Sequence, residues 1–433
     1  MTLVILFIIF GFLQSAVLAI SQKRQFLSLV SVINIIFFLG YVFRPLLIIY
    51  YFDGYTYKGL NVIEDPYTLT IILAIANYCY LFFVLGVIST RSGFKTDYLS
   101  LSNRSAIRLS ITLMILGLTS FIYFLYSSGF FNGGILSLFE YIYGERGFYY
   151  FRSFSFLFIF GVFGYLSLRK INSFNKAILV LICILISLSF YARQHFIIFV
   201  LLALNLIGVY GFTKHKGFKL PLRKMIIAAL IAPLLVYSMI VMLDFRSQLS
   251  GGKNIDISNM QDKEISLIDY VVNSGQLTFL DLSIDAMKYQ QNNIDLAGHS
   301  LKNILFLPVP SSLFPDKPES FNRALVKGNP GKNAPSPAFG FTSEIYFNFP
   351  YIYLFIGPIL MYIAGSFFRK SFISIQKSFT FYMLYLFLYT SFFMFIRSGL
   401  FSSIGGFIEK IGPFLFIVLV YKLILIKKQD ITL

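Results

Sequence analysis

The chain has no tryptophan, and its 433 residues include only two cysteines and three histidines. Cys79 and Cys183 both fall inside apolar runs, as small core residues do, so neither a disulfide framework nor a cysteine-ligated metal is expected. His195, His215 and His299 are scattered and stand outside any HExxH or paired-cysteine motif, which argues against a zinc site. The sequence therefore predicts a protein without a bound metal or other cofactor.

Charge is scarce as well, because charged residues make up 13% of the chain and hydrophobic residues 57%. Apolar runs of about 18–25 residues recur, and each is long enough to span a bilayer. A soluble multidomain protein, the usual expectation for this length, is thereby excluded. The sequence predicts an all-α polytopic integral membrane protein of about 11 transmembrane helices (10–12) with one large, partly helical outer loop. The expected spans are residues 2–20, 25–51, 66–90, 106–128, 150–168, 175–192, 195–212, 225–243, 349–368, 379–396 and 407–426.

The net charge of +17 is unevenly distributed along the chain. Roughly 20 basic residues fall in alternate short connections and roughly 5 in the intervening ones, which is the bias of cytoplasmic loops. The basic connections include Arg91, Arg104, Arg108, Lys176, Lys216, Arg369, Lys370 and Lys377. We therefore expect the N-terminus outside and the C-terminus in the cytoplasm. The positive charge reports topology and gives no argument for nucleic acid.

Residues 244–348 form the one long polar stretch and hold most of the 19 acidic residues. Because polar groups are costly in hydrocarbon, this stretch is expected outside the bilayer, on the side opposite the basic connections. The predicted organisation is eight transmembrane helices in residues 1–243, a loop domain in 244–348, and three transmembrane helices with a cytoplasmic tail in 349–433. Apolar spacing over Glu264–Tyr289 predicts one or two amphipathic helices within the loop domain.

Several arginines break the charge rule by standing at the predicted outer face. Arg193, Arg246 and Arg397 follow three different spans, and Arg146 and Arg152 lie in a tyrosine-rich loop on the same side. Each of them singly is explained by snorkelling toward lipid headgroups. As a set they favour an anion site, because the planar guanidinium fork pairs with phosphate oxygens through two hydrogen bonds.

Arg44, followed by Pro45, lies within the second span. Proline interrupts the helical hydrogen-bond ladder, and an arginine inside a membrane usually faces a bundle interior or a cavity. The alternative is that Arg44 marks the outer end of this helix.

Three short motifs accompany the long polar stretch. Residues 313–318 read Leu-Phe-Pro-Asp-Lys-Pro, residues 336–337 read Ser-Pro, and residues 343–349 read Ser-Glu-x-Tyr-x-Asn-Phe before a predicted helix. Together with the many spans and the outer arginines, this pattern resembles the O-antigen polymerase family, the Wzy-type polymerases of oligosaccharide repeat units on bacterial surfaces. One departure is Pro350, where the family usually has glycine after Asn-Phe.

The resemblance implies a glycosyltransferase of the bacterial inner (cytoplasmic) membrane that makes O-antigen or capsule without a nucleotide sugar. The donor is an oligosaccharide on undecaprenyl diphosphate, and the acceptor is a second lipid-linked unit whose hydroxyl attacks the anomeric carbon. A chain-length regulator and a flippase are implied partners, beside membrane lipids, and no nucleic acid is.

That chemistry needs cations for the leaving diphosphate and a base for the hydroxyl. Glu344 is the expected base with His299 behind it; the simpler alternatives are a salt-bridge or helix-start carboxylate and an ordinary loop histidine. The expected diphosphate-binding residues are Arg193, Arg246, Arg397, Arg323 and Lys317, and further substrate contacts are expected from Arg146, Arg152, Tyr346 and Asn348.

Two other functions fit the same architecture. An O-antigen ligase, which transfers the finished glycan to a lipid A core, shares it closely. A flippase for lipid-linked oligosaccharide is also polytopic and basic inside, although it has no need of a long outer loop. The motifs at 313–318 and 343–349 favour the polymerase.

Overall fold

The structure is a computed structural model. It describes residues 1–22, 28–56, 60–94, 101–134, 137, 149–169, 172–189, 279–289, 297–306, 318, 339–375, 377–393 and 395–430, without the side chains of 149–153, 188, 285, 288, 289, 409 and 421–430. Throughout these ranges the regular elements are helices, and the only strand-like pairing is an isolated bridge between Tyr55 and Asn61. The all-α class is confirmed for this part of the chain.

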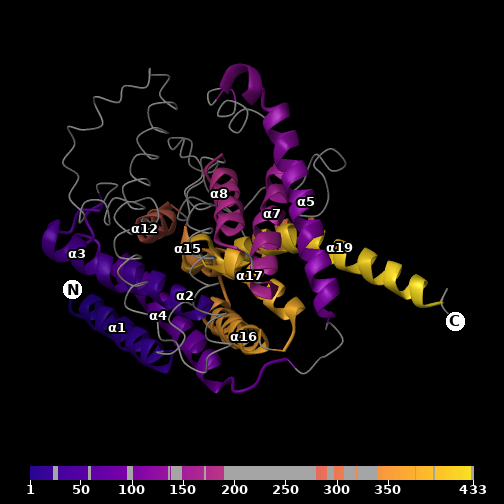
Figure 1. Cartoon of the computed structure of the whole chain (residues 1–433). Coiled ribbons are helices and arrows are strands. Elements are labelled where there is room, and N and C mark those ends of the chain that lie inside the picture. Colours follow the sequence, from indigo (N-terminus) through magenta and orange to yellow (C-terminus); the bar gives the residue numbers. More distant parts are fainter. Residues whose placement is uncertain are drawn as a thin grey trace. The chain divides into compact units, whose positions relative to one another are not determined.

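The helices follow the predicted spans closely (Figure 1). They are α1 (Thr2–Ser21), α2 (Leu29–Phe37), the π-helix η1 (Phe38–Phe43), α3 (Arg44–Tyr51), α4 (Pro66–Ser89), α5 (Asn103–Ser127), α7 (Tyr149–Leu168), α8 (Ser173–Ser189), α12 (Phe279–Tyr289), α13 (His299–Phe306), α15 (Gly340–Asn348), α16 (Tyr353–Ser374), α17 (Phe379–Phe392), α18 (Phe395–Ser398) and α19 (Leu400–Asp430).

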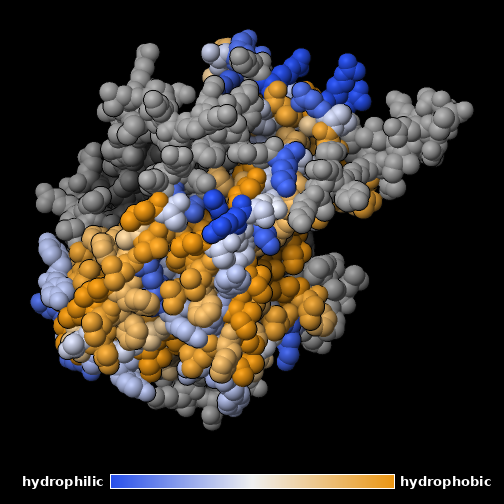
Figure 2. Space-filling model, turned by 90° about the horizontal axis from the view of Figure 1, so that it is seen from below, coloured by the Kyte–Doolittle hydropathy of each residue, from blue (hydrophilic) through white to orange (hydrophobic). Residues whose placement is uncertain are grey.

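Five stretches of helix in the described ranges are long and apolar enough to cross a membrane. They are Thr2–Ser21, Leu29–Tyr51, Pro66–Ser89, Asn103–Ser127 and Leu400–Val420. Figure 2 shows one face of the molecule, on which apolar side chains are widely exposed. The protein is therefore membrane-embedded, and it is all-α over the residues that the structure describes. The predicted spans 195–212 and 225–243 lie outside the described residues, so the count of eleven stays a prediction.

The chain forms two compact units. The first comprises Met1–Asp97, Ile265–Lys377 and Phe387–Glu409, and the second comprises Tyr98–Glu264, Ser378–Leu386 and Lys410–Leu433. Within the second unit α5 packs along α7, and Gly117 of α5 lies directly against the backbone of Phe158. The predicted site residues that the structure describes with their side chains all belong to the first unit.

In the first unit α4 packs against both α1 and α16. A Cβ at Gly86 of α4 would overlap the carbonyl oxygen of Tyr362, and one at Gly365 of α16 would overlap that of Phe83. Small residues at these two points let the backbones of α4 and α16 approach closely, as in other membrane helix pairs. On its other side α4 is tied to α1, because the Asn77 side chain donates to the carbonyl of Phe7 at 3.1 Å.

The second predicted span contains a π-helical segment. Pro45 has no N–H to donate, and the N–H of Arg44 reaches the carbonyl of Leu39 five residues back rather than four. Arg44 is fully buried and lies well inside the Leu29–Tyr51 span, so it does not mark an exposed helix end.

Two helices from the predicted loop domain pack against this span. The ring of Phe279 on α12 packs at a tilt against that of Tyr41 on η1 with 5.2 Å between ring centroids, and the Tyr41 hydroxyl is 3.0 Å from that of Thr342 on α15. A hydrogen bond also joins α12 to the start of α15, because Ser283 on α12 donates to the carbonyl of Phe339 at 2.6 Å. The position of residues 244–348 relative to the membrane stays a prediction.

Candidate functional site

Glu344, the predicted base, lies on α15 and is completely buried. Its Oε2 accepts the backbone N–H of Phe401 at 2.9 Å, and its Oε1 accepts the backbone N–H and the hydroxyl of Ser402, each at 3.2 Å. Both donor residues belong to the first turn of α19, whose N–H groups have no partner within the helix. A carboxylate there also meets the positive end of the helix dipole. Glu344 thus caps α19 from a distant part of the chain.

The turn before α19 is shaped around this carboxylate. Gly399, between α18 and α19, has φ +96°, a conformation that other residues adopt only under strain. A Cβ at Gly399 would stand 2.5 Å from Cδ of Glu344, well inside van der Waals contact. Glycine is required here for both reasons, and its absence of a side chain is what admits the Glu344 carboxylate to the helix end.

Asn348 lies one helical turn after Glu344 and caps a second helix. Its Oδ1 accepts the backbone N–H of Ser300 at 2.7 Å, at the start of α13, and its Nδ2 donates to the Ser300 hydroxyl at 2.9 Å. The Ser300 hydroxyl in turn lies 3.4 Å from Oε1 of Glu344, a long hydrogen bond. The short helix α15 therefore joins the starts of α13 and α19 through hydrogen bonds among Ser300, Glu344, Asn348 and Ser402. We call these four residues, together with Gly399, the α15 cluster.

Burial raises the pKa of Glu344 from an ordinary 4.5 to about 7, although the N–H donors of Phe401 and Ser402 act in the opposite direction. Removing a carboxylate from water disfavours its charged form, and here that effect exceeds the favourable hydrogen bonds. Glu344 is thus a carboxyl group that takes up and releases a proton near neutral pH, a property common at functional sites.

The other described site residues lie beside the α15 cluster. His299 is the first residue of α13, adjacent to Ser300, and it is half-buried. Arg397 is on α18, two residues before Gly399, and is also half-buried. The structure therefore brings Glu344, Asn348, His299 and Arg397 into one region around α15, although 44 residues separate Ser300 from Glu344 and 57 separate Glu344 from Phe401.

Tyr346, predicted as a substrate contact, is half-buried on α15. Its ring meets that of Tyr353 edge to face, with 5.1 Å between the centroids. This contact joins α15 to the start of α16.

The remaining predicted residues are not placed. Arg146, Arg193, Arg246, Lys317 and Arg323 lie outside the described residues, and Arg152 is on α7 but its side chain is not described. Among the residues that the structure covers, no three His, Cys, Asp or Glu side chains are grouped so as to hold a metal ion. A metal-free reaction stays a prediction.

Arg44 has a partner that the sequence does not reveal. Its two terminal nitrogens donate to the two carboxylate oxygens of Asp281 on α12, each at 2.6 Å, and both side chains are fully buried. The signal available in the sequence is indirect, since an arginine inside a membrane requires a compensating charge. Likewise, Ser300, Gly399 and Ser402 are not predicted as site residues from the sequence. The one available signal is that Gly399 lies two residues after the predicted site residue Arg397.

Comparison of the chain with protein-family models, with curated proteins and with solved structures gives no match.

Proposed function

We propose that this protein is a polymerase of lipid-linked oligosaccharide repeat units, of the O-antigen polymerase class. The observation that carries the proposal is the convergence at α15. The Ser-Glu-x-Tyr-x-Asn-Phe motif puts Glu344 and Asn348 on one small helix, and these two residues hold the segments that bear Arg397 and His299. A motif, a cation and a histidine from three distant segments of the chain thus share one region of a membrane-embedded protein.

The reaction needs a cation at the leaving group. The acceptor hydroxyl oxygen bonds to the anomeric carbon, the bond from that carbon to the diphosphate oxygen breaks, and polyprenyl diphosphate leaves with the electron pair. Arg397 carries a planar fork of donors suited to diphosphate oxygens and stabilises the charge that develops there. Arg193, Arg246, Arg323 and Lys317 are proposed to complete the anion site.

We assign to His299 the role of general base, which removes the proton of the acceptor hydroxyl. A general base must come within hydrogen-bonding distance of the hydroxyl, and His299 is half-buried whereas Glu344 is enclosed by protein on all sides. Glu344 then acts as a positioning residue, because its carboxylate fixes the Gly399 turn and, with it, Arg397. This differs from the sequence-based expectation of Glu344 as the base.

The direct test is the glycan phenotype of a deletion strain. Loss of a polymerase leaves single repeat units attached to the surface lipid, whereas loss of a ligase leaves none and loss of a flippase leaves the donor on the cytoplasmic side. The deletion is complemented with wild-type protein and with the His299→Gln variant at matched membrane levels. Single units in the deletion strain, and chains restored only by the wild type, support the proposal; absence of attached units contradicts it.

Purified protein with lipid-linked repeat units gives the biochemical arm. We expect chain growth in the presence of a strong metal chelator, because the proposed cations are side chains. A complete loss of activity that added divalent metal restores would contradict this.

The proposed orientation places the protein in the inner membrane with its N-terminus and residues 244–348 outside and its C-terminus in the cytoplasm. Cysteines introduced at Ser250 and Lys216 test it by labelling of intact cells. Both natural cysteines are buried, so the background label is low. Labelling at Lys216 without permeabilisation would refute the orientation.

A further inference from the structure

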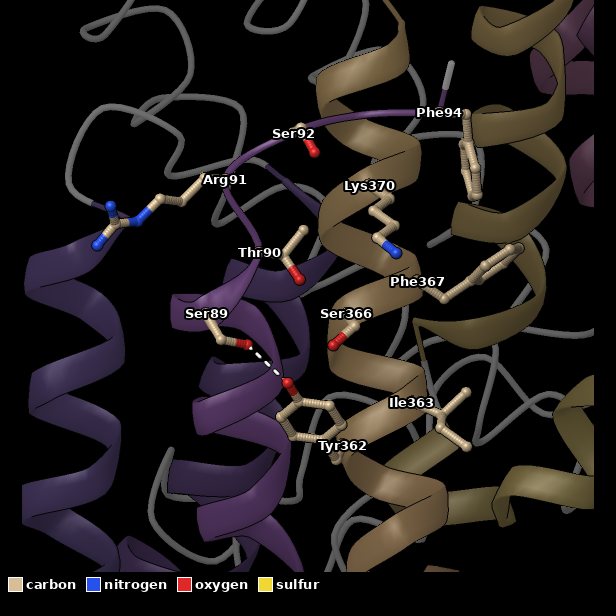
Figure 3. Close-up of a pocket in the computed structure, with 10 residues that line it drawn as sticks. All are labelled: Ser89, Thr90, Arg91, Ser92, Phe94, Tyr362, Ile363, Ser366, Phe367 and Lys370. Atoms are coloured by element: carbon tan, nitrogen blue, oxygen red, sulfur yellow. Dashed lines mark hydrogen bonds between the residues drawn. The ribbon is translucent and has the colours of Figure 1, made fainter. Parts of the chain in front are cut away.

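A pocket of about 490 Å³ lies in the first unit, between the end of α4 and the face of α16 (Figure 3). Lys370 and Ser366 line it from α16, and Thr90 and Ser92 line it from the segment after α4. Arg91 is on the rim, with its guanidinium directed away from α16. The pocket is far from the α15 cluster in sequence and shares no residue with it.

The hydroxyl groups of this pocket are unequal. Those of Thr90 and Ser366 donate to the carbonyl of Gly86 at 2.8 and 3.1 Å, so neither has a proton left for a ligand. The Ser366 bond also joins α16 to α4. Ser92 is exposed, and within the described residues its hydroxyl has no hydrogen bond. The pocket therefore offers one unused hydroxyl donor.

The basic side chains near the pocket also differ in whether they have a hydrogen-bond partner. Arg369 donates to the side chain of Gln22 at 3.4 Å, and Lys377 donates to the carbonyl of Phe94. By contrast, the side chains of Lys370 and Arg91 form no hydrogen bond or ion pair with any residue that the structure describes. Two positive charges and a hydroxyl thus line one open pocket, Arg91 from its rim, and none of the three has an anionic partner among the described residues.

An apolar track leads away from the pocket along α16. Ile363 at the pocket, then Ile359 and Phe355, are spaced four residues apart and so lie on one face of the helix. They are exposed by 56%, 57% and 74%. A free anion gains nothing from contact with these apolar side chains, whereas an acyl chain packs against them.

We propose that this pocket binds an anionic phospholipid. Lys370 and Ser92 hold the headgroup phosphate, Arg91 on the rim adds a second positive charge beside it, and an acyl chain follows Ile363 and Phe355 along α16. Arg91 and Lys370 belong to connections predicted to be cytoplasmic, and basic pockets between helices on that side bind acidic lipid headgroups. The proposal is independent of glycosyl transfer.

Native mass spectrometry of the full-length protein in detergent tests this directly. The protein is incubated with equal amounts of phosphatidylglycerol and phosphatidylcholine, and each retained lipid is identified by its mass. We expect the wild type to retain phosphatidylglycerol in preference. The double variant Arg91→Gln/Lys370→Gln should lower the affinity for phosphatidylglycerol about thirtyfold, since each basic residue near a headgroup contributes about 1 kcal/mol and the variant removes two.

The matched control is Arg104→Gln/Lys176→Gln, which removes one arginine and one lysine that are exposed and lie outside the pocket. It should retain the lipid like the wild type. Ser92→Asp supplies a second test that removes no cation: its carboxylate repels phosphate and should also lower occupancy. Because Arg91, Ser92 and Lys370 are all exposed, these variants are expected to fold.

Three results would overturn the proposal. One is equal phosphatidylglycerol retention by the wild type and the pocket variants. Another is an equal loss in the control variant, which would mean general surface charge. The third is displacement of the lipid by millimolar inorganic phosphate, which would identify the pocket as a site for free phosphate.

Discussion

Arg44 and Asp281 meet end to end inside the first unit, both terminal guanidinium nitrogens lying 2.6 Å from the two carboxylate oxygens, although 237 residues separate them in the chain. Neither side chain is exposed to any extent. A charge left alone at such depth costs several kcal/mol, so each residue depends on the other. The pair therefore fixes α12 against the π-helical part of the second span.

Breaking this pair should be costly, and removing it entirely should be much less so. We expect Arg44→Met or Asp281→Leu alone to lower the free energy of unfolding by about 3–5 kcal/mol. The double variant should be more stable than the sum of the single effects implies, because no charge is left unpaired. Thermal unfolding in detergent measures this, with the exposed Arg104→Met as control. Strict additivity of the two single effects would contradict the proposed dependence.

The stability of the protein should depend on the proton of Glu344. Because the pKa in the folded protein is raised above its ordinary value, the protonated carboxyl favours folding. This contribution is fully present below about pH 4.5 and is lost as the pH rises through about 7. From the size of the shift it amounts to at most about 3 kcal/mol.

Thermal unfolding of the wild type between pH 5 and 8 measures that slope. Glu344→Gln has no proton to release and should lose it, while Glu64→Gln, at an exposed carboxyl, should keep it. An unchanged slope in Glu344→Gln would show that other groups cause the pH dependence.

Gly399→Ala should disrupt the α15 cluster. The φ of +96° is strained for alanine, and the new Cβ collides with the Glu344 carboxylate. We expect the strain alone to lower the free energy of unfolding by about 1–3 kcal/mol. Gly406→Ala is the matched control on α19, since a Cβ there meets nothing within 4 Å. It should be neutral or slightly stabilising, because alanine suits a helix interior better than glycine. Equal stability of the two alanine variants would show that Gly399 has no special role.

The sequence predicts the helices of this protein better than it predicts the contacts between them. The helix boundaries follow from hydropathy, because a run that spans the bilayer must satisfy its own hydrogen bonds. The region around α15 follows in part, because Glu344, Asn348, His299 and Arg397 are polar residues at the ends of apolar runs. Their contacts do not follow, since Glu344 meets its donors 57 residues further along the chain.

Asp281 illustrates the same limit. It lies in a polar stretch where a carboxylate is unremarkable, and its burial becomes evident only when α12 packs against η1. An interior position is one of two interpretations of Arg44 from the sequence. Spacing alone does not identify which of the 19 acidic residues pairs with it.

Arg397 should contribute to turnover through its geometry as well as its charge. A single charge-assisted contact is worth about 1.5–3 kcal/mol, so Arg397→Ala should lower polymerisation about ten- to a hundredfold. Arg397→Lys keeps the charge but loses the planar fork and should fall between the two. The measurement is the glycan chain-length ladder at matched membrane levels, with Arg104→Ala as control. A full ladder from Arg397→Ala would mean that the diphosphate is held elsewhere.

The close packing of α4 on α16 has a consequence for biogenesis. Gly86 and Ser366, which touch in the finished protein, are 280 residues apart in the chain. At a synthesis rate of about 5–20 residues per second, α4 waits roughly a quarter of a minute to a minute for α16 to be made. Its bonds to α1 form early, because Phe7 and Asn77 emerge close together. The side of α4 that packs on α16 must therefore face lipid or an insertion factor until the last fifth of the chain is synthesised.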